Sequence, residues 1–450
     1  PGIPPPFEVS CCMRGAPSSH AVPLLAAACL LSACAESTDH LDRRGALTHA
    51  ASSFLSEEAA APPAPEPPAP APAPRDRAPP IIRGVYGSSD AAGSPEKRAK
   101  LLALADSTEI NAFVVDVKDD DGIRYVSRDP LAREVSQGTI PLRDLGALVD
   151  TLRAHGIHPI ARVVVFKDRY LAPARPEWAI RTPEGKLWID KAGNRWMSPW
   201  DERVWDYNIR VAEEAARAGF REIQFDYVRF PEAYRSLPAQ VHARERGERS
   251  EAIAGFLAEA RRRLHPLGVT VTADLFGLSM NEAADVGIGQ QWETLSGIAD
   301  HLLPMVYPSH YFPTHLPGIR TPNQLPYETV LTSVGMGVIR NQRMQAAGRR
   351  PARIVPWIQG FSMGHRYGPE EARAQKRAVY ELGLEDWIFW NAASRYDAIA
   401  AGLERETTPR ARRFDPPQRL VRMVDRFDRE GAADARARLS QERAPAVGSE

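Results

Sequence analysis

The fold is decided by the stretch ERVWDYNIRVAEEAARAGFREIQFDYVRF, residues 202–230. Its first part, 202–218, is amphipathic, and Gly219 follows directly. The run 222–230 is then mostly apolar and aromatic. A glycine just past a helix is a common stop, and an apolar run is typical of a strand buried on both faces. The stretch therefore predicts a helix followed by a strand of a parallel sheet.

The same unit recurs along the chain. Seven further strand-like runs occur, at 81–87, 112–119, 158–166, 269–277, 301–309, 353–361 and 386–392. Helix-like segments alternate with them, the last at 394–402. Eight alternating units predict an α/β fold, a (β/α)₈ TIM barrel over 81–403, with a long insertion after the third strand, at 167–201. An open doubly wound sheet is the alternative, but the first turn, GVYGS (84–88), lacks the glycine pattern of a dinucleotide site.

The segments that flank the predicted barrel have other roles. Residues 13–34 combine an early Arg, an apolar stretch and small residues before Cys34, which predicts a secretory signal ending in a lipobox. Residues 1–12 precede Met13, and we interpret them as an overcalled start. The Pro/Ala-rich linker 35–80 is a semi-rigid spacer. We expect Cys34 to be lipidated, and Ala35 indicates an outer-membrane protein facing the periplasm or the exterior. The charged tail 404–450 predicts a docked helix near 416–429.

Composition excludes several classes of function. The chain has 57 Lys and Arg against 57 Asp and Glu, which argues against a nucleic-acid partner. No apolar run reaches the roughly 18 residues of a spanning helix, so we expect membrane contact through the lipid anchor only. All four cysteines lie within the first 34 residues, so the barrel has no thiolate chemistry. No HExxH, GxSxG or calcium-loop pattern occurs, and we expect no metal and no cofactor.

Titratable residues gather where the predicted strands end. Asp226 and Asp274 end the fourth and fifth strands, and a barrel carries its active site at that edge. Two carboxylates facing one cavity suit glycoside hydrolysis, with Asp274 as the acid and Asp226 as the nucleophile or base. Asp116, Lys118 and Arg229 would tune their charge. In the alternative, Asp226–Arg229 and Asp116–Lys118 are internal ion pairs that brace the barrel.

Aromatic residues follow the later strands. Sugar rings stack on flat apolar faces such as those of Trp and Tyr. The predicted substrate-binding residues are Tyr307, His310, Tyr311, Trp357, Gln359 and Trp390. The insertion adds four tryptophans, which either bind sugar or form the core of the loop.

Four motifs resemble a known family. They are VVDVKDD (114–120), IQFDYVRFP (223–231), MVYPSHY (305–311) and VPWIQGF (355–361). Together they are similar to the bacterial family of putative glycosyl hydrolase domains, over roughly 81–400. The resemblance implies a TIM barrel distantly like α-amylase. It places the nucleophile at Asp226, puts Asp274 where amylase-like barrels usually have Glu, and puts Gln359 near their third Asp.

Three hypotheses follow. The first is a lipid-anchored glycoside hydrolase of the cell envelope that acts on a polysaccharide or oligosaccharide. The second is a carbohydrate-binding lipoprotein without catalysis, which keeps the aromatic mouth but lacks a usable acid and base. The third is an envelope scaffold, in which the insertion 167–201 fills the mouth of the barrel.

Overall fold

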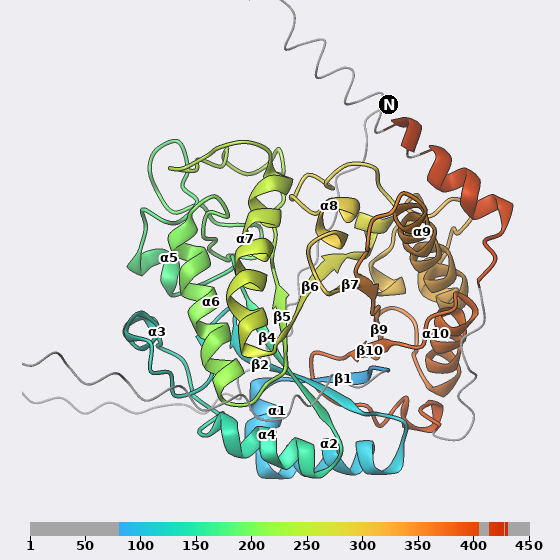
Figure 1. Ribbon diagram of the computed structural model, residues 1–450, viewed down its shortest axis with the longest axis horizontal. Coiled ribbons are helices and arrows are strands. Elements are labelled where there is room, and N and C mark those ends of the chain that lie inside the picture. The colour runs from blue at the N-terminus through green and yellow to red at the C-terminus, as the bar shows by residue number, and fades with distance from the viewer. Residues whose placement is uncertain (1–80, 405–413, 427, 431–450) are drawn as a thin grey trace, which may run out of the picture. The chain divides into compact units, whose positions relative to one another are not determined.

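The computed structural model describes residues 81–404, 414–426 and 428–430 (Figure 1). The predicted signal segment, Cys34, the linker 35–80 and most of the charged tail lie outside these residues. The described part is the predicted barrel with one added C-terminal helix. In this part no helix has both the length and the apolar character needed to cross a bilayer.

Eight parallel strands close into a barrel, so the predicted (β/α)₈ fold is confirmed (Figure 1). β1 pairs with both β2 and β10, which closes the sheet. The barrel strands are β1 (Arg83–Gly87), β2 (Ala112–Asp119), β4 (His158–Val164), β5 (Glu222–Asp226), β6 (Thr270–Phe276), β7 (His301–Val306), β9 (Trp357–Gln359) and β10 (Trp387–Trp390).

Two short strands extend this sheet. β3 (Gly122–Ile123) pairs antiparallel with the end of β2 and makes a hairpin at the edge of the barrel mouth. β8 (Arg353–Ile354) pairs with the start of β7, and β9 pairs with its end. Val355 and Pro356 separate β8 from β9; a proline has no N–H to give to a ladder of hydrogen bonds. The seventh predicted strand is therefore present but interrupted.

Helices cover the outside of the barrel. The long ones are α2 (Pro95–Ser107), α4 (Leu145–Ala154), α6 (Glu202–Arg217), α7 (Arg249–Leu264), α9 (Pro326–Ala346) and α10 (Pro369–Glu381). The short ones are α1 (Ser89–Gly93), α3 (Pro130–Val135), α5 (Leu171–Ala174) and α8 (Trp292–Ser296). Ser94, Asp144 and Asp201 accept backbone N–H groups at the starts of α2, α4 and α6. Such caps satisfy groups that a helix leaves open.

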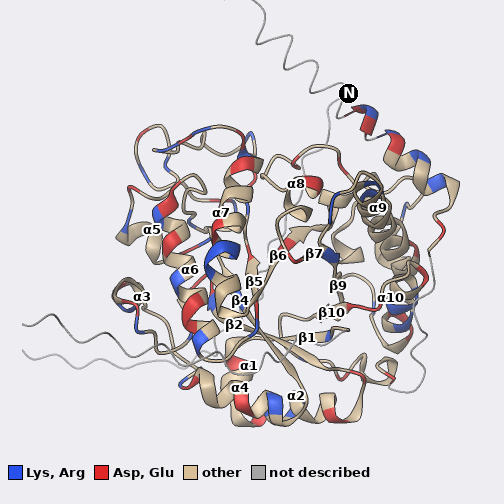
Figure 2. Ribbon diagram, in the orientation of Figure 1, with Lys and Arg blue, Asp and Glu red and all other residues tan. Residues whose placement is uncertain are grey.

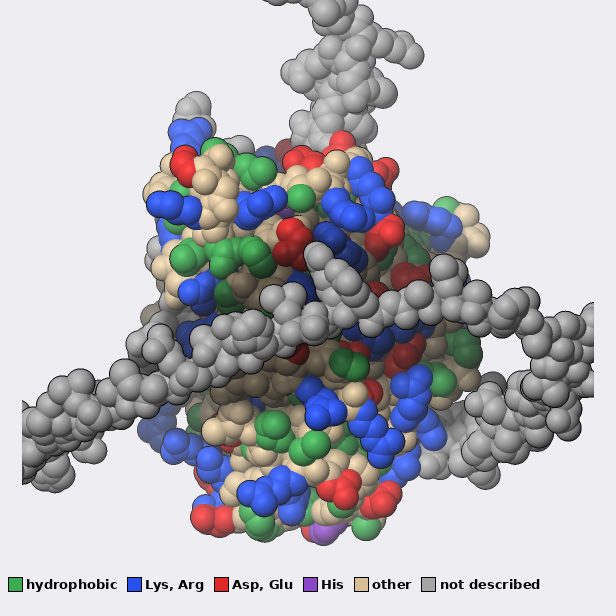
Figure 3. Space-filling model, turned by 90° about the vertical axis from the view of Figure 1, so that its left-hand side faces the viewer, with side chains coloured by type: hydrophobic (Ala, Val, Ile, Leu, Met, Phe, Trp, Pro, Cys, Tyr) green, Lys and Arg blue, Asp and Glu red, His purple; other side chains and the backbone are tan. Residues whose placement is uncertain are grey.

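One predicted helix is wrong. Residues 394–402 form only a short 3₁₀ turn, Ala400–Gly402, and Ser394 at their start has a left-handed backbone with φ of 52°. A non-glycine residue in that region interrupts a helix. Positively and negatively charged residues are interspersed along the helices (Figure 2). Lys and Arg are interspersed with Asp and Glu over the face seen in Figure 3, in keeping with the balanced composition.

The insertion after β4 forms a lobe at one side of the barrel, shown in green above α5 and α6 in Figure 1. It is held by backbone bridges, among them Lys167 to Trp196 and Ala179 to Met197. Arg181 also bridges Val241, so the loop after β5 joins the same lobe. Three of the four tryptophans of the insertion are buried, with exposures of 0 to 3%: Trp188, Trp196 and Trp200. These three form the core of the loop.

The C-terminal helix packs on α9. Residues 418–426 and 428–430 are helical, close to the predicted 416–429. Their side chains bury an apolar cluster that joins Met336 and Ile339 of α9 to Leu420, Met423 and Val424. At the end of this contact Arg343 pairs with Asp425 and Asp428. The predicted docked helix is therefore present.

Candidate active site

Polar side chains from neighbouring strands meet inside the barrel near its C-terminal end. The register places Asp116 of β2 opposite Arg162 of β4, and Arg162 opposite Gln224 of β5. Since side chains alternate along a strand, Gln224 and Asp226 share the inner face. Phe225 pairs with the residue before Asp274, so Asp226 and Asp274 stand at the same height on adjacent strands. Arg162 and Gln224 thus lie in one layer of the barrel, and Asp226 and Asp274 lie in the layer directly above it.

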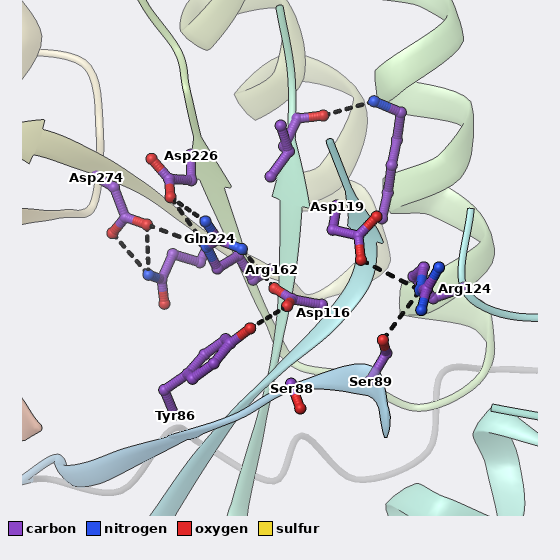
Figure 4. Close-up of polar contacts among 12 residues, drawn as sticks. Tyr86, Ser88, Ser89, Asp116, Asp119, Arg124, Arg162, Gln224, Asp226 and Asp274 are labelled. Atoms are coloured by element: carbon purple, nitrogen blue, oxygen red, sulfur yellow. Dashed lines mark hydrogen bonds and ion pairs between the residues drawn. The ribbon is translucent and has the colours of Figure 1, made fainter. Parts of the chain in front are cut away.

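Arg162 is the centre of this cluster (Figure 4). Its Nη1 donates to Asp116 Oδ1 at 2.5 Å, and its Nε donates to Asp226 Oδ2 at 3.0 Å. Its Nη2 also donates to Asp226 Oδ2, and Nε lies 3.9 Å from Asp274 Oδ2. Burial opposes a charge here, but the neighbouring Asp226 and Asp116 outweigh it and raise the pKa of the guanidinium. One cation therefore faces three carboxyl groups, which it cannot neutralise together.

Asp274 is the carboxyl group that this imbalance affects most. Its exposure is 1%, and burial followed by the nearby charge of Asp226 raises its pKa well above the usual value. Gln224 Nε2 donates to both carboxyl oxygens at 2.6 and 2.8 Å, and Trp357 Nε1 donates to Oδ1 at 2.7 Å. The Gln224 Oε1 atom is buried without a hydrogen-bond partner. A half-turn of this amide would let Oε1 accept a hydrogen bond from a protonated Asp274.

Asp116 accepts a hydrogen bond from a tyrosine. The Tyr86 hydroxyl donates to Asp116 Oδ2, and burial is the main cause that raises the pKa of both groups. The Tyr86 ring lies 4.1 Å from the ring of Trp390, and the Arg162 guanidinium lies 5.4 Å from that ring. Asp116 therefore fixes one end of Arg162, and the aromatic pair covers the guanidinium.

A further acid lies at the end of β2. Burial and the charge of Asp116 raise the pKa of Asp119 to about 7. Asp119 Oδ2 lies 3.1 Å from Arg124 Nε, and Arg124 also donates to Ser89 at 3.0 Å (Figure 4). This pair stands at the hairpin of β2 and β3, beside the cluster. The motif VVDVKDD contains Asp119, but its residue types do not distinguish Asp119 from Asp120, which follows it.

The two other cations expected near the carboxyl groups lie elsewhere. A β-bulge between Asp116 and Lys118 turns Lys118 away from the inner face. Lys118 Nζ instead pairs with Asp168 at 2.9 Å and donates to Val164 O at 2.6 Å. Arg229 donates to Phe230 O and Glu232. Neither predicted brace, Asp116–Lys118 nor Asp226–Arg229, is formed, and Arg162 is the cation that contacts the carboxyl groups.

The backbone is strained directly after Asp226. Tyr227 has a φ of 49°, a left-handed conformation that is costly for a side chain of this size. Its N–H donates to Asp226 Oδ1 at 2.5 Å, and its ring lies 4.6 Å from Lys167 Nζ. The fourth strand therefore ends at Asp226, four residues before the sequence predicts. The strained turn holds the Asp226 carboxyl group against its own backbone.

The predicted substrate-binding residues divide into two groups. Trp357, Trp390 and Tyr307 lie in the apolar cluster of the barrel interior, next to the carboxyl groups. Burial and the charges of Asp274 and Asp226 raise the pKa of Tyr307. Two further residues form hydrogen bonds with other parts of the protein. Tyr311 turns its hydroxyl to Ser333 of α9, and the side-chain amide of Gln359 bonds to backbone groups of two loops.

His310, the remaining predicted residue, belongs to neither of these two groups. It is half-buried after β7, its ring lies 5.5 Å from that of Tyr307, and its Nδ1 is 2.9 Å from Ser309 Oγ. Burial lowers its pKa to about 4, so it is neutral at pH 7. No group of three or more His, Cys, Asp or Glu with the arrangement of a metal site occurs in the described ranges.

The fold and the cluster define a TIM-barrel protein with carboxyl groups at the C-terminal ends of its strands. Residues 84–396 match the family of "putative glycosyl hydrolase domain" proteins. The chain belongs to this family, because the match spans more than half of it. A search of curated proteins finds no match.

Three solved structures are similar to this chain. A hypothetical protein from Ruminiclostridium thermocellum ATCC 27405 is 37% identical over 42% of this chain and 97% of its own, with a TM-score of 0.39. The glycoside hydrolase domain of PgaB (BpsB) from Bordetella bronchiseptica is 14% identical over 73% and 100%, with a TM-score of 0.50. That of PelA from Pseudomonas aeruginosa is 13% identical over 72% and 99%, with a TM-score of 0.40. At such identities the likeness to PgaB shows the barrel fold alone.

The cluster predicts an unusual titration. We expect the Asp274 carboxyl carbon, followed by NMR from pH 3 to 9, to titrate well above the ordinary value, since burial and Asp226 both favour its protonated form. The folded chain keeps this proton after the unfolded chain has lost it, so its contribution to stability falls as pH rises above about 4.

Two variants make this measurement specific. Asp274→Asn identifies the signal by removing it. Asp226→Asn removes the neighbouring charge and should lower the midpoint of Asp274. A midpoint of about 4 or below in the unmodified protein would show that the carboxyl group is ionised at neutral pH.

Proposed function

We propose that the protein is a glycoside hydrolase that cleaves glycosidic bonds of a polysaccharide or oligosaccharide. One observation carries the proposal: two carboxyl groups stand at the same height on adjacent strands in different environments. Asp226 accepts two hydrogen bonds from Arg162, whereas burial and the charge of Asp226 raise the pKa of Asp274. Family membership supports this activity. Two carboxyl groups in contrasting environments are the usual basis for assigning an acid and a base.

The roles follow from these environments. Asp274, whose pKa is raised, supplies the proton to the leaving oxygen as the general acid. Asp226 attacks the anomeric carbon, or activates a water molecule that does so. The Asp226 position agrees with the nucleophile of amylase-like barrels, and Asp274 is one methylene shorter than their Glu. Arg162 positions Asp226 and limits the negative charge at the mouth.

The surroundings of the carboxyl groups suit a sugar. The partly exposed ring of Trp390 lies 5.6 Å from that of Trp357, whose N–H is already bonded to Asp274. Tyr307 is close enough for both carboxylates to affect its pKa. In the described chain, the polar contacts of the carboxyl groups of Asp116, Asp226 and Asp274 come from the barrel strands or from Tyr227 next to Asp226. None comes from the insertion 167–201, which disfavours the scaffold hypothesis.

A carbohydrate-binding protein without catalysis is the second candidate. The observation that favours it is the low exposure of the cluster, 1% for Asp274 and 6% for Asp226. Each carboxyl group already has protein partners, so a substrate must reach groups that are nearly covered. A protein that binds sugar on the aromatic residues alone would have the same fold and the same exposed rings.

Location is part of the proposal. The lipobox ending at Cys34 and the Pro/Ala-rich linker support a lipoprotein of the cell envelope, held at the outer membrane by its anchor and facing the periplasm or the exterior. A carbohydrate substrate outside the cytoplasm agrees with this location.

Hydrolysis is the direct test of the activity. The full chain should release reducing ends from at least one member of a panel of peptidoglycan, α- and β-glucans and envelope polysaccharide. Asp226→Asn should lower kcat/KM by about 10³-fold or more, because it removes the nucleophile or base; this corresponds to about 4 kcal/mol of barrier. Glu232→Gln, which changes a nearby carboxylate that bonds only to Arg229, is the control. If neither protein cleaves the panel but the unmodified chain binds one polysaccharide, the binding-protein hypothesis holds instead.

The acid role of Asp274 has its own signature. Asp274→Asn should slow hydrolysis of natural glycosides by about 10²- to 10⁴-fold, since the leaving oxygen no longer receives a proton. Activity on p-nitrophenyl glycosides, whose leaving group departs without protonation, should fall much less. The measurement is the ratio of kcat/KM for the two substrate types. An equal loss on both would assign Asp274 a structural role.

The anchor is tested by one substitution. Cells fed a radiolabelled fatty acid should label the full chain, and Cys34→Ala should abolish the label, because the thiol is the site of attachment. Cys29→Ala keeps Cys34 and should leave the label unchanged. Label retained after Cys34→Ala would overturn the lipobox interpretation.

A further inference from the structure

Three rings stand side by side where β7 and β9 end. Tyr307, His310 and Phe361 contact one another edge to face, with centroids 5.5 to 5.9 Å apart. Tyr307 is buried, whereas His310 and Phe361 are partly exposed. Because the loops after these strands lie at the C-terminal end of the barrel, this three-ring wall borders the same mouth as the carboxyl groups. We call Tyr307, His310 and Phe361 the ring wall.

The wall is held in place by a buried amide. The Gln359 side chain has no exposed surface, and its Oε1 accepts the backbone N–H of Ser309 at 3.0 Å. Its Nε2 donates to Phe361 O at 2.9 Å. The same side chain thus fixes the loop that carries His310 and the loop that carries Phe361. Gln375 of α10 bonds to both backbone groups of Gln359 and orients it in turn. Groups fixed before a ligand arrives lose little freedom when it binds.

The ring wall carries no charge at neutral pH. Tyr307 and Phe361 are uncharged, and burial keeps the pKa of His310 at about 4. Two exposed apolar side chains lie on the same two loops, Phe312 at 47% and Met363 at 55%. The titratable groups that act on Tyr307, at the inner end of the wall, include Asp226, Asp274 and Arg162. A ligand here meets apolar surface, one imidazole and one phenol, with carboxyl groups on one side.

We propose that the ring wall is a binding subsite for an uncharged sugar ring, adjacent to the bond that is cleaved. The proposal rests on the proposed function and names the substrate class: a polymer whose units are neutral at this position, either plain hexose or N-acetylated. Sugar C–H groups face the Phe361 ring, while the His310 Nε2 and the Tyr307 hydroxyl bond to sugar hydroxyls. A uronic acid would place its carboxylate near the Asp226 carboxylate and be repelled.

Binding measurements on the full chain test this subsite. The probes are hexasaccharides of β-1,4-linked glucose, β-1,3-linked glucose and N-acetylglucosamine, and hexagalacturonate as the anionic one. Calorimetry at pH 7 is done on Asp274→Asn, which removes the acid; should that variant not fold, the unmodified chain is titrated at low temperature. At least one neutral probe should bind, and hexagalacturonate should bind at least tenfold more weakly.

Substitutions at Phe361 connect the binding to the wall. Phe361→Ala should weaken binding of the neutral probe by about tenfold, because a stacking face is lost, and Phe361→Trp should restore it. Tyr327→Ala removes a ring on the outer helix α9 that lies under Arg377, and should leave affinity unchanged. Equal affinity of Phe361→Ala and the unmodified chain, or stronger binding of hexagalacturonate, would overturn the proposal.

Failure of this inference differs from failure of the proposed function. If the chain hydrolyses a polysaccharide and Phe361→Ala changes neither Kd nor KM, the hydrolase proposal is supported and the subsite proposal is wrong. If a neutral probe binds through Phe361 and no substrate is cleaved, the subsite stands and the hydrolase proposal falls. Absence of binding by all four probes would overturn the subsite.

Discussion

The contacts of Arg162 with Asp116 and Asp226 are the constraint on which the mouth of the barrel depends. A guanidinium buried to 5% exposure needs anionic partners, and three neighbouring strands supply them. Arg162 therefore draws the carboxyl groups together, and their crowding then opposes full ionisation. Burial and the charge of Asp226 raise the pKa of Asp274, and the single positive charge of Arg162 does not offset them. The cluster is both the internal support of β2, β4 and β5 and the origin of its acid–base asymmetry.

Much of the fold could be predicted from sequence. Buried parallel strands appear as apolar runs and the helices between them as amphipathic stretches, so the eight units and their order followed from pattern alone. Local backbone events could not be predicted in this way. The left-handed Tyr227 ends β5 early, and the left-handed Ser394 stands at the start of the missing final helix. Neither residue is a glycine, so the residue type does not predict a left-handed backbone at either position.

The site was harder to predict than the fold. Asp226 and Asp274 were found because an acid at the end of an apolar strand is conspicuous. Arg162 was missed because it lies in the middle of HPIARVVVF, one layer below the strand end. Lys118 was placed with the carboxyl groups because alternation alone cannot anticipate the bulge next to Asp116. Gln359 was predicted to bind sugar, but its side-chain amide forms hydrogen bonds with the backbone of two loops. Only the three-dimensional pairing of β7 and β9 reveals these bonds.

The helical residues 418–426 and 428–430 have a consequence for where this protein can be truncated. The family match ends at residue 396, but Leu420, Met423 and Val424 cover Met336 and Ile339 of α9. A fragment ending at the family boundary would leave that apolar strip of α9 open to water, and contiguous apolar surface of this kind promotes self-association. The stretch that defines the family is thus shorter than the stretch that covers the apolar surface of α9.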